Sequence, residues 1–286
     1  DTCCDAFKSY LKEKNIFYLP MTYIVDEQPY FDHFDSDEEF RGFYDMVRGG
    51  KMPKTAQANV YETAEYFEKL LKENEGDLIH LALSSGLSNT AVNAQTAAQE
   101  VMEKFPGRKI YALDSLGATQ GMMYVLDRAI ELREQGLTAE QAVEEIKKII
   151  DRLHHYLIVT DLSHLQRGGR ISGVAAFVGG LLKISPIIVI NHKGQLVVKD
   201  KERGPKRLDY LVKAAKKHIK PGLNKAYIAH ADDLETAQKL KEMLAKEGIT
   251  DVKIGYIGPI IGSHTGPDAI GLVFEGTERF TIQPKH

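Results

Sequence analysis

The chain has 286 residues and a formal net charge of −3, with 43% hydrophobic and 27% charged residues. This composition is typical of a globular protein, and the sequence contains no run of about 20 apolar residues that would span a bilayer. The lack of a basic surplus argues against a nucleic-acid partner. The length allows one large domain or two ordinary ones, with room for a core and an internal cavity.

Cysteine and histidine usage indicates neither a disulfide framework nor a metal site. The two cysteines, Cys3 and Cys4, are neighbours, and no Cys-x-x-Cys or His-Glu-x-x-His motif occurs. His154 and His155 are adjacent, a spacing that does not suit a zinc site. The N-terminus has no basic-then-apolar signal segment, and we therefore expect a protein of the reducing cytoplasm without a metal or other cofactor.

The first half of the chain alternates strands with amphipathic helices. The expected elements are a β-rich segment at Ile16–Val25, helices at Glu38–Val47 and Val60–Lys72, a strand at Leu78–Leu83, a helix at Ser88–Lys104, a strand at Ile110–Leu113 and a helix at Thr138–Ile150. This alternation predicts βαβ units and a mainly parallel sheet flanked by helices. Ligands of such sheets bind beyond the carboxyl ends of the strands.

The second half predicts a mixed α/β arrangement. The expected elements are a strand at Leu157–Thr160, a glycine-rich turn at Gly168–Gly173, an apolar helix at Val174–Leu182, an antiparallel hairpin of Pro186–Ile190 and Leu196–Lys199, and two helix-strand pairs, Arg207–Ile219 with Ala226–Ala229 and Leu234–Lys246 with Val252–Tyr256. We predict an N-terminal α/β domain at 1–155, with a small β-rich insertion at about 16–50, and a C-terminal mixed-sheet α/β domain at 156–286.

Four polar or glycine-rich segments between the periodic stretches are candidates for function. They are Lys54–Gln57, Ser84–Ser88, Gly168–Ser172 and Gly258–Pro267. The last segment holds His264 among three glycines and two prolines. Glycine permits positive φ and proline fixes the neighbouring bends, so the pattern favours a shaped functional loop over a plain connection. A purely structural role for His264 is the alternative.

Six motifs stand in a recognisable order along the chain. They are Thr-x-Gln at Thr55–Gln57, Ser-Ser-Gly-Leu-Ser at Ser84–Ser88, Asp-Ser-Leu-Gly at Asp114–Gly117, Arg-Gly-Gly-Arg-Ile-Ser at Arg167–Ser172, Lys-x-Arg-Gly at Lys201–Gly204 and Gly-Pro-Ile-Ile-Gly-Ser-His-Thr-Gly-Pro at Gly258–Pro267. In this order, and from Asp1-Thr2 through Gly271, the sequence resembles the DegV family. The resemblance implies a two-domain α/β fold that binds a fatty acid. Several members serve as the binding subunit of a bacterial fatty acid kinase and present the acid for phosphorylation to an acyl phosphate.

The resemblance also implies roles for individual residues. The carboxylate would be held by Thr55, by Ser85 or Ser88, and by His264. Arg170, with the nearby basic residues Arg167 and Arg203, would dock the kinase. An intramolecular ion pair of Arg170 is the alternative. The sequence departs from the family at Ala56, Ala58 and Asn59, where Thr-Ser-Gln-Pro-Ser is preferred, so acyl-chain preference does not carry over.

The free-energy cost of burying a carboxylate points to a site with the same kinds of residues. Burying a carboxylate costs several kcal/mol unless protein donors replace its water. Hydroxyl groups, an imidazole and the free N–H groups at the start of the helix after Ser88 supply such donors. Simple helix capping by Ser85 or Ser88 is the alternative. The candidate residues of the acyl-chain lining are Ala118, Met122, Val174, Phe177, Val178 and Ile187.

Other functions compete with this interpretation. Ser88 or Ser85 with His264 and Asp268 has the residue types of an acyl hydrolase, but no Gly-x-Ser-x-Gly elbow occurs and Asp268 is only four residues from His264. Phosphorylation by the chain itself lacks a nucleotide-binding motif. A passive lipid carrier without a kinase partner is a further alternative, and transient contact with a membrane fits either lipid role. We therefore predict a lipid-binding protein that is not itself an enzyme.

Overall fold

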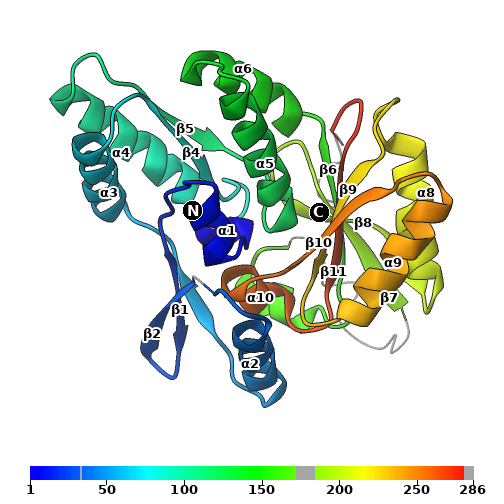
Figure 1. Ribbon diagram of the computed structural model, residues 1–286. Helices are drawn as coiled ribbons and strands as arrows, with labels where there is room; N and C mark the ends of the chain where they lie inside the picture. The colour runs from blue at the N-terminus through cyan, green and yellow to red at the C-terminus, as the bar shows by residue number, and fades with distance from the viewer. Residues whose placement is uncertain (33, 172–183, 280–286) are drawn as a thin grey trace.

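The computed structural model describes residues 1–32, 34–171 and 184–279 (Figure 1). Its N-terminal part contains a small antiparallel sheet and a parallel pair of strands, and its C-terminal part contains a six-stranded sheet. The predicted helix at Val174–Leu182 lies outside the described residues, as do Ser172 and Gly173 of the predicted turn. In the part of the chain that is described, no helix is long and apolar enough to cross a bilayer.

A small β unit, residues Met21–Ala56, projects from the N-terminal part. It follows η1 (Thr2–Cys4) and α1 (Lys8–Glu13) and comprises β1 (Met21–Val25), β2 (Gln28–Asp32), α2 (Asp37–Arg48) and β3 (Lys54–Ala56). The strand order is β2-β1-β3, all antiparallel, and the turn between β1 and β2 has positive φ at both Asp26 and Glu27. A capping box of Ser36 and Glu39 starts α2, whose apolar face is buried. β1 and β3 contact the segment Pro259–Thr265 near the end of the chain.

The remaining N-terminal elements form the predicted βαβ arrangement. They are α3 (Val60–Glu73), β4 (Leu78–Ala82), α4 (Thr90–Lys104), β5 (Ile110–Asp114), α5 (Gln120–Glu134) and α6 (Ala139–Ile150). β4 and β5 pair in parallel, with Leu78 opposite Ile110. Small residues on α4, such as Ala94 and Ala98, let it pack closely in the core that it shares with α3. The loops after β4 and β5 therefore lie at one edge, as carboxyl ends of parallel strands must.

The C-terminal part is the predicted mixed-sheet α/β domain. It contains β6 (Leu153–Ile158), α7 (Ser163–Gly168), β7 (Ile184–Ile190), β8 (Leu196–Arg203), α8 (Lys206–His218), β9 (Lys225–His230), α9 (Leu234–Lys246), β10 (Asp251–Tyr256), α10 (Pro259–Thr265) and β11 (Ile270–Glu275). The strand order is β10-β9-β11-β6-β7-β8, and among these neighbours β9 and β10 are parallel. Helices α8 and α9 cover one face of the sheet, while α5 contacts β9 and β11 (Figure 1).

Three details differ from the expectations. β6 begins at Leu153, so the predicted boundary at residue 155 falls inside a strand of the C-terminal sheet. The segment Ser163–Gly168 is a short helix that ends at Gly169 in the left-handed conformation, with φ 66°. The segment Gly258–Pro267 is not an irregular loop, because Pro259 starts the helix α10. Proline at the first helical position is favoured by its fixed φ, a signal that outweighs the local glycines.

Candidate functional site

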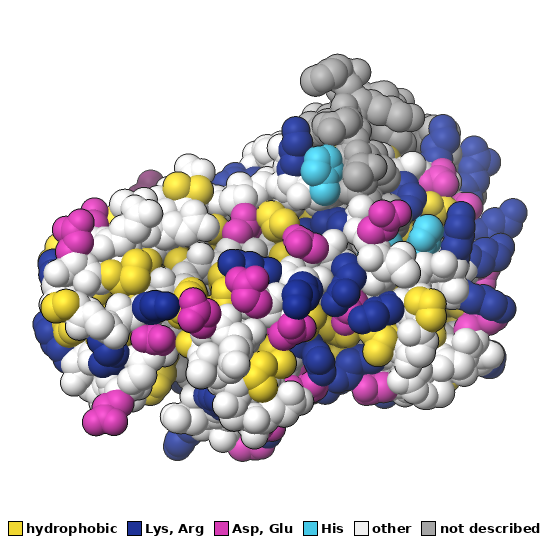
Figure 2. All heavy atoms as spheres, turned by 90° about the horizontal axis from the view of Figure 1, so that it is seen from above, with side chains coloured by type: hydrophobic (Ala, Val, Ile, Leu, Met, Phe, Trp, Pro, Cys, Tyr) yellow, Lys and Arg dark blue, Asp and Glu magenta, His cyan; other side chains and the backbone are white. Residues whose placement is uncertain are grey.

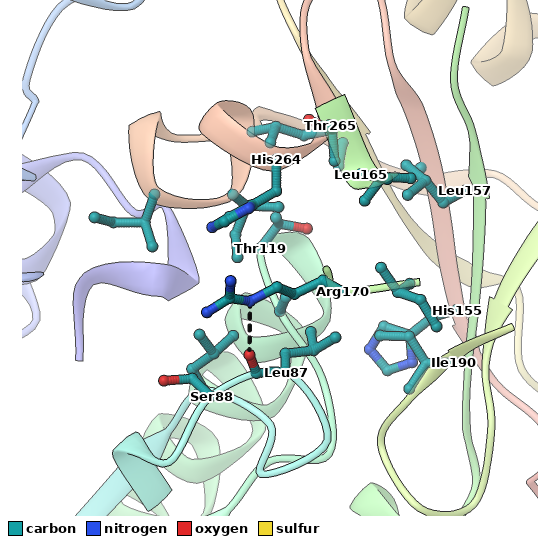
Figure 3. A pocket seen from close by; sticks show the side chains of 18 of the residues that line it. Leu87, Ser88, Thr119, His155, Leu157, Leu165, Arg170, Ile190, His264 and Thr265 are labelled. Atoms are coloured by element: carbon teal, nitrogen blue, oxygen red, sulfur yellow. Dashed lines mark hydrogen bonds between the residues drawn. The ribbon is translucent and has the colours of Figure 1, made fainter. Parts of the chain in front are cut away.

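A cavity of about 460 Å³ lies between the small β unit, the loops after β4 and β5, and the C-terminal sheet. This volume is within the usual range of small-molecule pockets. Most of its wall is aliphatic. The apolar wall includes Leu83, Leu165, Ile190, Leu196, Ile257 and Ile260. Figure 3 shows Leu157, Leu165 and Ile190 on one side of this pocket and His264 and Ser88 on the other.

The polar end of the cavity joins two residues far apart in sequence. Thr55 Oγ1 and His264 Nε2 lie 3.0 Å apart, although 209 positions separate the residues. Thr55 is held by β3, where it pairs with Tyr23 of β1. His264 is held by the last turn of α10, which contacts both β1 and β3. Because these elements belong to different parts of the fold, the contact exists only when the small β unit and the C-terminal domain are together.

The His264 ring is held in place and uncharged at neutral pH. Burial lowers the pKa of His264 to about 4, and the positive charges of Arg170 and Arg167 act in the same direction. Its Nδ1 packs on Gly168, where an added Cβ would lie only 2.2 Å away. When Nε2 carries the proton, the ring donates to Thr55, and the Thr55 hydroxyl proton is then available to a ligand. A glycine at 168 is therefore a requirement of the site.

The two candidate serines have different environments. Ser88 lines the cavity, and its Oγ lies 2.8 Å from Thr90 Oγ1 and accepts the Thr90 N–H at 3.3 Å. Ser85 is exposed, does not line the cavity, and donates its N–H to Asp114 Oδ1 at 3.1 Å. Only Ser88 of the pair is therefore in place to meet a ligand in this cavity, and the same hydroxyl also serves the start of α4.

The loop that carries Ser88 is anchored to the C-terminal domain. Ser84 Oγ donates to the Gly194 carbonyl at 2.8 Å, in the turn between β7 and β8. Gly86 faces the same turn, and a Cβ at this position would lie 2.4 Å from Gly194 backbone atoms. Here the glycine of the Ser-Ser-Gly-Leu-Ser motif permits two backbones to approach closely. The contact closes one side of the cavity.

The three candidate arginines are not equivalent. Arg170 lines the cavity, donating Nε to the Leu87 carbonyl at 3.4 Å and Nη1 to the Gly168 carbonyl (Figure 3). Within the described residues it contacts no carboxylate, so the alternative of an intramolecular ion pair is wrong for this part of the chain. Arg167 is exposed and lies 3.0 Å from His164 Nδ1, and Arg203 is exposed at the end of β8.

The residues of the hydrolase alternative are not arranged as a triad. His264 Nε2 contacts Thr55, and Asp268 Oδ1 accepts from Arg48 at 2.8 Å. Ser88 is bonded to Thr90. A nucleophile, base and orienting acid must be linked in series, and here each has a different partner. The geometry therefore favours a binding site over this hydrolytic arrangement.

The expected acyl-chain lining is only partly correct. Ala118 lines the cavity, whereas Met122 and Ile187 are buried in other places. Ile187 belongs to the core under α8 and α9, because its neighbours in β7 alternate between the two faces of the sheet. Val174, Phe177 and Val178 lie outside the described residues.

Sequence reasoning overlooked polar residues of the lining, notably Thr119 and His155. His155 is buried, and burial lowers its pKa well below the usual value. Thr119 lies two residues after the Asp-Ser-Leu-Gly motif, which begins at the last residue of the parallel strand β5. The rule that ligands bind at the carboxyl ends of parallel strands is the signal by which Thr119 could have been found from the sequence. No cluster of three or more potential metal ligands occurs among the described side chains.

Fold and cavity together define a two-domain α/β protein with an apolar pocket that ends in hydrogen-bond donors. Comparison with known proteins agrees with this class. The profile of the family described as "Uncharacterised protein, DegV family COG1307" matches residues 1–277. A DegV domain-containing protein of Clostridium perfringens is 35% identical over 279 residues, 96% of each chain. The chain belongs to the DegV family.

Solved structures extend the comparison. A DegV lipid binding protein from Thermotoga maritima has a TM-score of 0.83 and 28% identity, and the match covers 98% of this chain and 97% of that chain. DegV from Bacillus subtilis, a fatty acid binding protein, has a TM-score of 0.80 and 27% identity over 97% of each chain. The predicted fold class, a two-domain DegV fold with a C-terminal mixed sheet, is thereby confirmed.

Proposed function

We propose that the protein binds one long-chain fatty acid and presents its carboxylate to a partner fatty acid kinase, which phosphorylates it to an acyl phosphate. The observation that carries the proposal is the pairing of Thr55 with His264 at the polar end of an otherwise aliphatic cavity. Ser88 and Arg170 line the same cavity and add a hydroxyl and a positive charge. The fatty acid and lipid binding of the two structural relatives supports the choice of ligand.

Energetics assign different tasks to the two ends of the ligand. Each buried CH₂ contributes about 0.8 kcal/mol relative to water, and an acyl chain gains nearly the same free energy when it enters a membrane. Burial of the tail therefore roughly cancels when the acid moves from a bilayer to the protein. The donors at the polar end then decide net affinity, because they must replace the water that the carboxylate loses when it is buried. Cavity shape decides which chain fits.

A kinase partner is part of the proposal because the chain lacks a nucleotide-binding motif of its own. Arg170, Arg167 and Arg203 are the proposed docking residues, all exposed. Figure 2 shows Lys and Arg side chains gathered toward the C-terminal domain, where α8 carries Lys206, Arg207, Lys213, Lys216 and Lys217. Such a surface suits an acidic partner or transient contact with a membrane. The free thiols of Cys3 and Cys4 fit a cytoplasmic role in phospholipid metabolism.

Mass spectrometry of the purified protein under native and then denaturing conditions tests the ligand. The expected result is a native mass excess of one fatty acid, identified after solvent extraction. Thr55→Val removes the hydroxyl that contacts His264, and we expect oleate uptake to weaken by about 10-fold. Ser85→Ala is the matched control, since Ser85 is outside the cavity. A bare native mass with no uptake of oleate or palmitate would contradict the proposal.

A coupled assay tests the presentation role. The isolated chain with ATP and oleate should yield no acyl phosphate, and addition of a fatty acid kinase should produce it. Arg203→Ala is the cleaner docking variant, because Arg203 does not line the cavity and oleate uptake should be unchanged. Full product formation by both Arg203→Ala and Arg170→Ala would reject docking at these residues. Uptake of oleate without any kinase-dependent product would leave a passive lipid carrier as the better description.

A further inference from the structure

Thr119, the residue before α5, has a backbone conformation that other residues adopt more easily. Its φ is 51° and its ψ is −131°. These angles are close to those of the first central residue of a type II′ turn, a position dominated by glycine. A β-branched residue with positive φ is an outlier, and such outliers concentrate at functional sites.

The neighbouring glycines show that this segment uses glycine for another purpose. A Cβ at Gly117 would lie 2.7 Å from His155 Nε2, and a Cβ at Gly121 would lie 2.0 Å from the same atom. Both glycines are therefore placed to make room for the His155 ring. Thr119 stands where the backbone itself favours glycine, so its side chain must serve a purpose that offsets the strain.

Local structure does not supply that purpose. The Thr119 N–H donates to the Cys3 carbonyl at 2.7 Å, and the Thr119 carbonyl accepts from Met123 at 3.0 Å. These bonds involve backbone atoms and would form equally with glycine. Thr at a helix N-cap normally accepts a hydrogen bond from the first turn, but the Thr119 side chain makes no capping bond. Its hydroxyl has no hydrogen-bond partner within the described residues.

The hydroxyl is directed into the cavity. Thr119 lines the cavity and is only 8% exposed. In the view of Figure 3 it lies between His264 and Arg170, which line the same cavity. It also stands at the N-terminus of α5, a helix of 15 residues whose partial positive charge favours an anion. The unpartnered hydroxyl of a buried residue and a helix N-terminus thus meet at one point.

We propose that Thr119 is a further carboxylate-binding residue, whose strained backbone holds its hydroxyl toward the ligand oxygen that Thr55 does not reach. This inference rests on the proposed function and adds a donor from α5 to those from β3 and α10. Each of the two carboxylate oxygens then has a hydroxyl donor of its own.

Binding of palmitate and of 1-hexadecanol by matched variants tests the inference. Thr119→Val keeps the shape but removes the hydroxyl, and we expect palmitate affinity to fall on the order of 10-fold while hexadecanol affinity changes less than about three-fold. Thr119→Ser keeps the hydroxyl and should bind palmitate like the wild type. Thr119→Gly relieves the strain, so its Tm should rise while palmitate affinity falls.

The outcomes separate the inference from the proposed function. Unchanged palmitate binding by Thr119→Val, with the wild type binding normally, would overturn the role of Thr119 alone. Equal losses for palmitate and hexadecanol would also overturn it, since they would indicate a change in cavity shape. A wild-type protein that takes up no palmitate would overturn the proposed function and this inference with it.

Discussion

The two faces of the six-stranded sheet come from the same strands but border different interiors. On the face covered by α8 and α9, Ile228, Leu272 and Phe274 are 0% exposed and belong to one continuous core. On the opposite face, Ala229 and Gly271 border the cavity. Successive residues of a strand point to opposite faces, so on β9 and β11 the alternation places Ile228 and Leu272 in the core and Ala229 and Gly271 at the cavity.

Where β9 and β11 pair, residue size and not hydrophobicity separates the core face of the sheet from the cavity face. Gly271 of β11 pairs with Ala229 of β9 and with Leu157 of β6. A Cβ at Gly271 would lie 3.2 Å from the Ala229 Cβ, so the two strands offer little bulk at this point. Protein interiors are otherwise close-packed, and a hollow must be kept open by small residues next to rigid elements.

The largest expected effect is on stability, from truncation on the filled face. Leu272→Ala should lower the free energy of unfolding by about 2–5 kcal/mol, because it leaves a cavity in a close-packed core. Leu157→Ala is the matched change on the hollow face, where the side chain already borders empty space. We expect it to cost less than half as much in urea denaturation. Equal losses would contradict the distinction between the faces.

Enlarging a small residue should reduce ligand binding on the cavity face and reduce stability on the core face. Ala229→Leu should fill the cavity and reduce oleate uptake by at least about 10-fold, with a loss of stability below about 1 kcal/mol. Ala226→Leu on the same strand overfills the core under α8 and α9, where Ala226 is 0% exposed. It should destabilise the protein by about 1–3 kcal/mol and leave the cavity intact. Isothermal titration and urea denaturation distinguish the two variants.

A smaller effect, on the pH dependence of stability, is expected from a pair of buried acids that lies outside both faces of the sheet. Asp5 and Asp32 are both buried and lie close enough to interact electrostatically. Burial raises the pKa of Asp32 to about 8, and burial together with the charge of Asp32 raises that of Asp5. The other titratable groups near the pair are the thiols of Cys3 and Cys4 and the phenols of Tyr23 and Tyr44. The pair therefore retains a proton in the folded protein.

The sign of the pH dependence follows from these shifts. Between the usual value of 3.8 and about 8 the folded state binds more protons than the unfolded chain, so the free energy of unfolding falls as pH rises through this window. Asp32→Asn cannot ionise and should reduce the difference between pH 5.5 and pH 8 by more than about 1 kcal/mol. The exposed Asp45→Asn is the control. An unchanged pH profile for Asp32→Asn would contradict a shared proton.

Much of the fold could be predicted from local pattern. The helix predicted at Thr138–Ile150 is α6, which a capping box of Thr138 and Gln141 starts, and the predicted hairpin of β7 and β8 turns at Gly194 with φ 73°. Both signals involve residues close in sequence, where propensity and turn chemistry act directly. The short helix α10 was not expected, because its seven residues are too few to show a helical period.

For the candidate site, too, local sequence pattern predicts some features and long-range packing determines the others. The sequence by itself determined which residue types and motifs were available, including Thr55, Ser88 and His264, and the family resemblance assigned them a carboxylate. Only the tertiary structure decided that Ser88 and not Ser85 lines the cavity, that Arg170 borders it, and that Thr119 joins them. The reason is physical: contacts such as Thr55 with His264 span 209 positions and depend on how β3 and α10 pack, which no local pattern encodes.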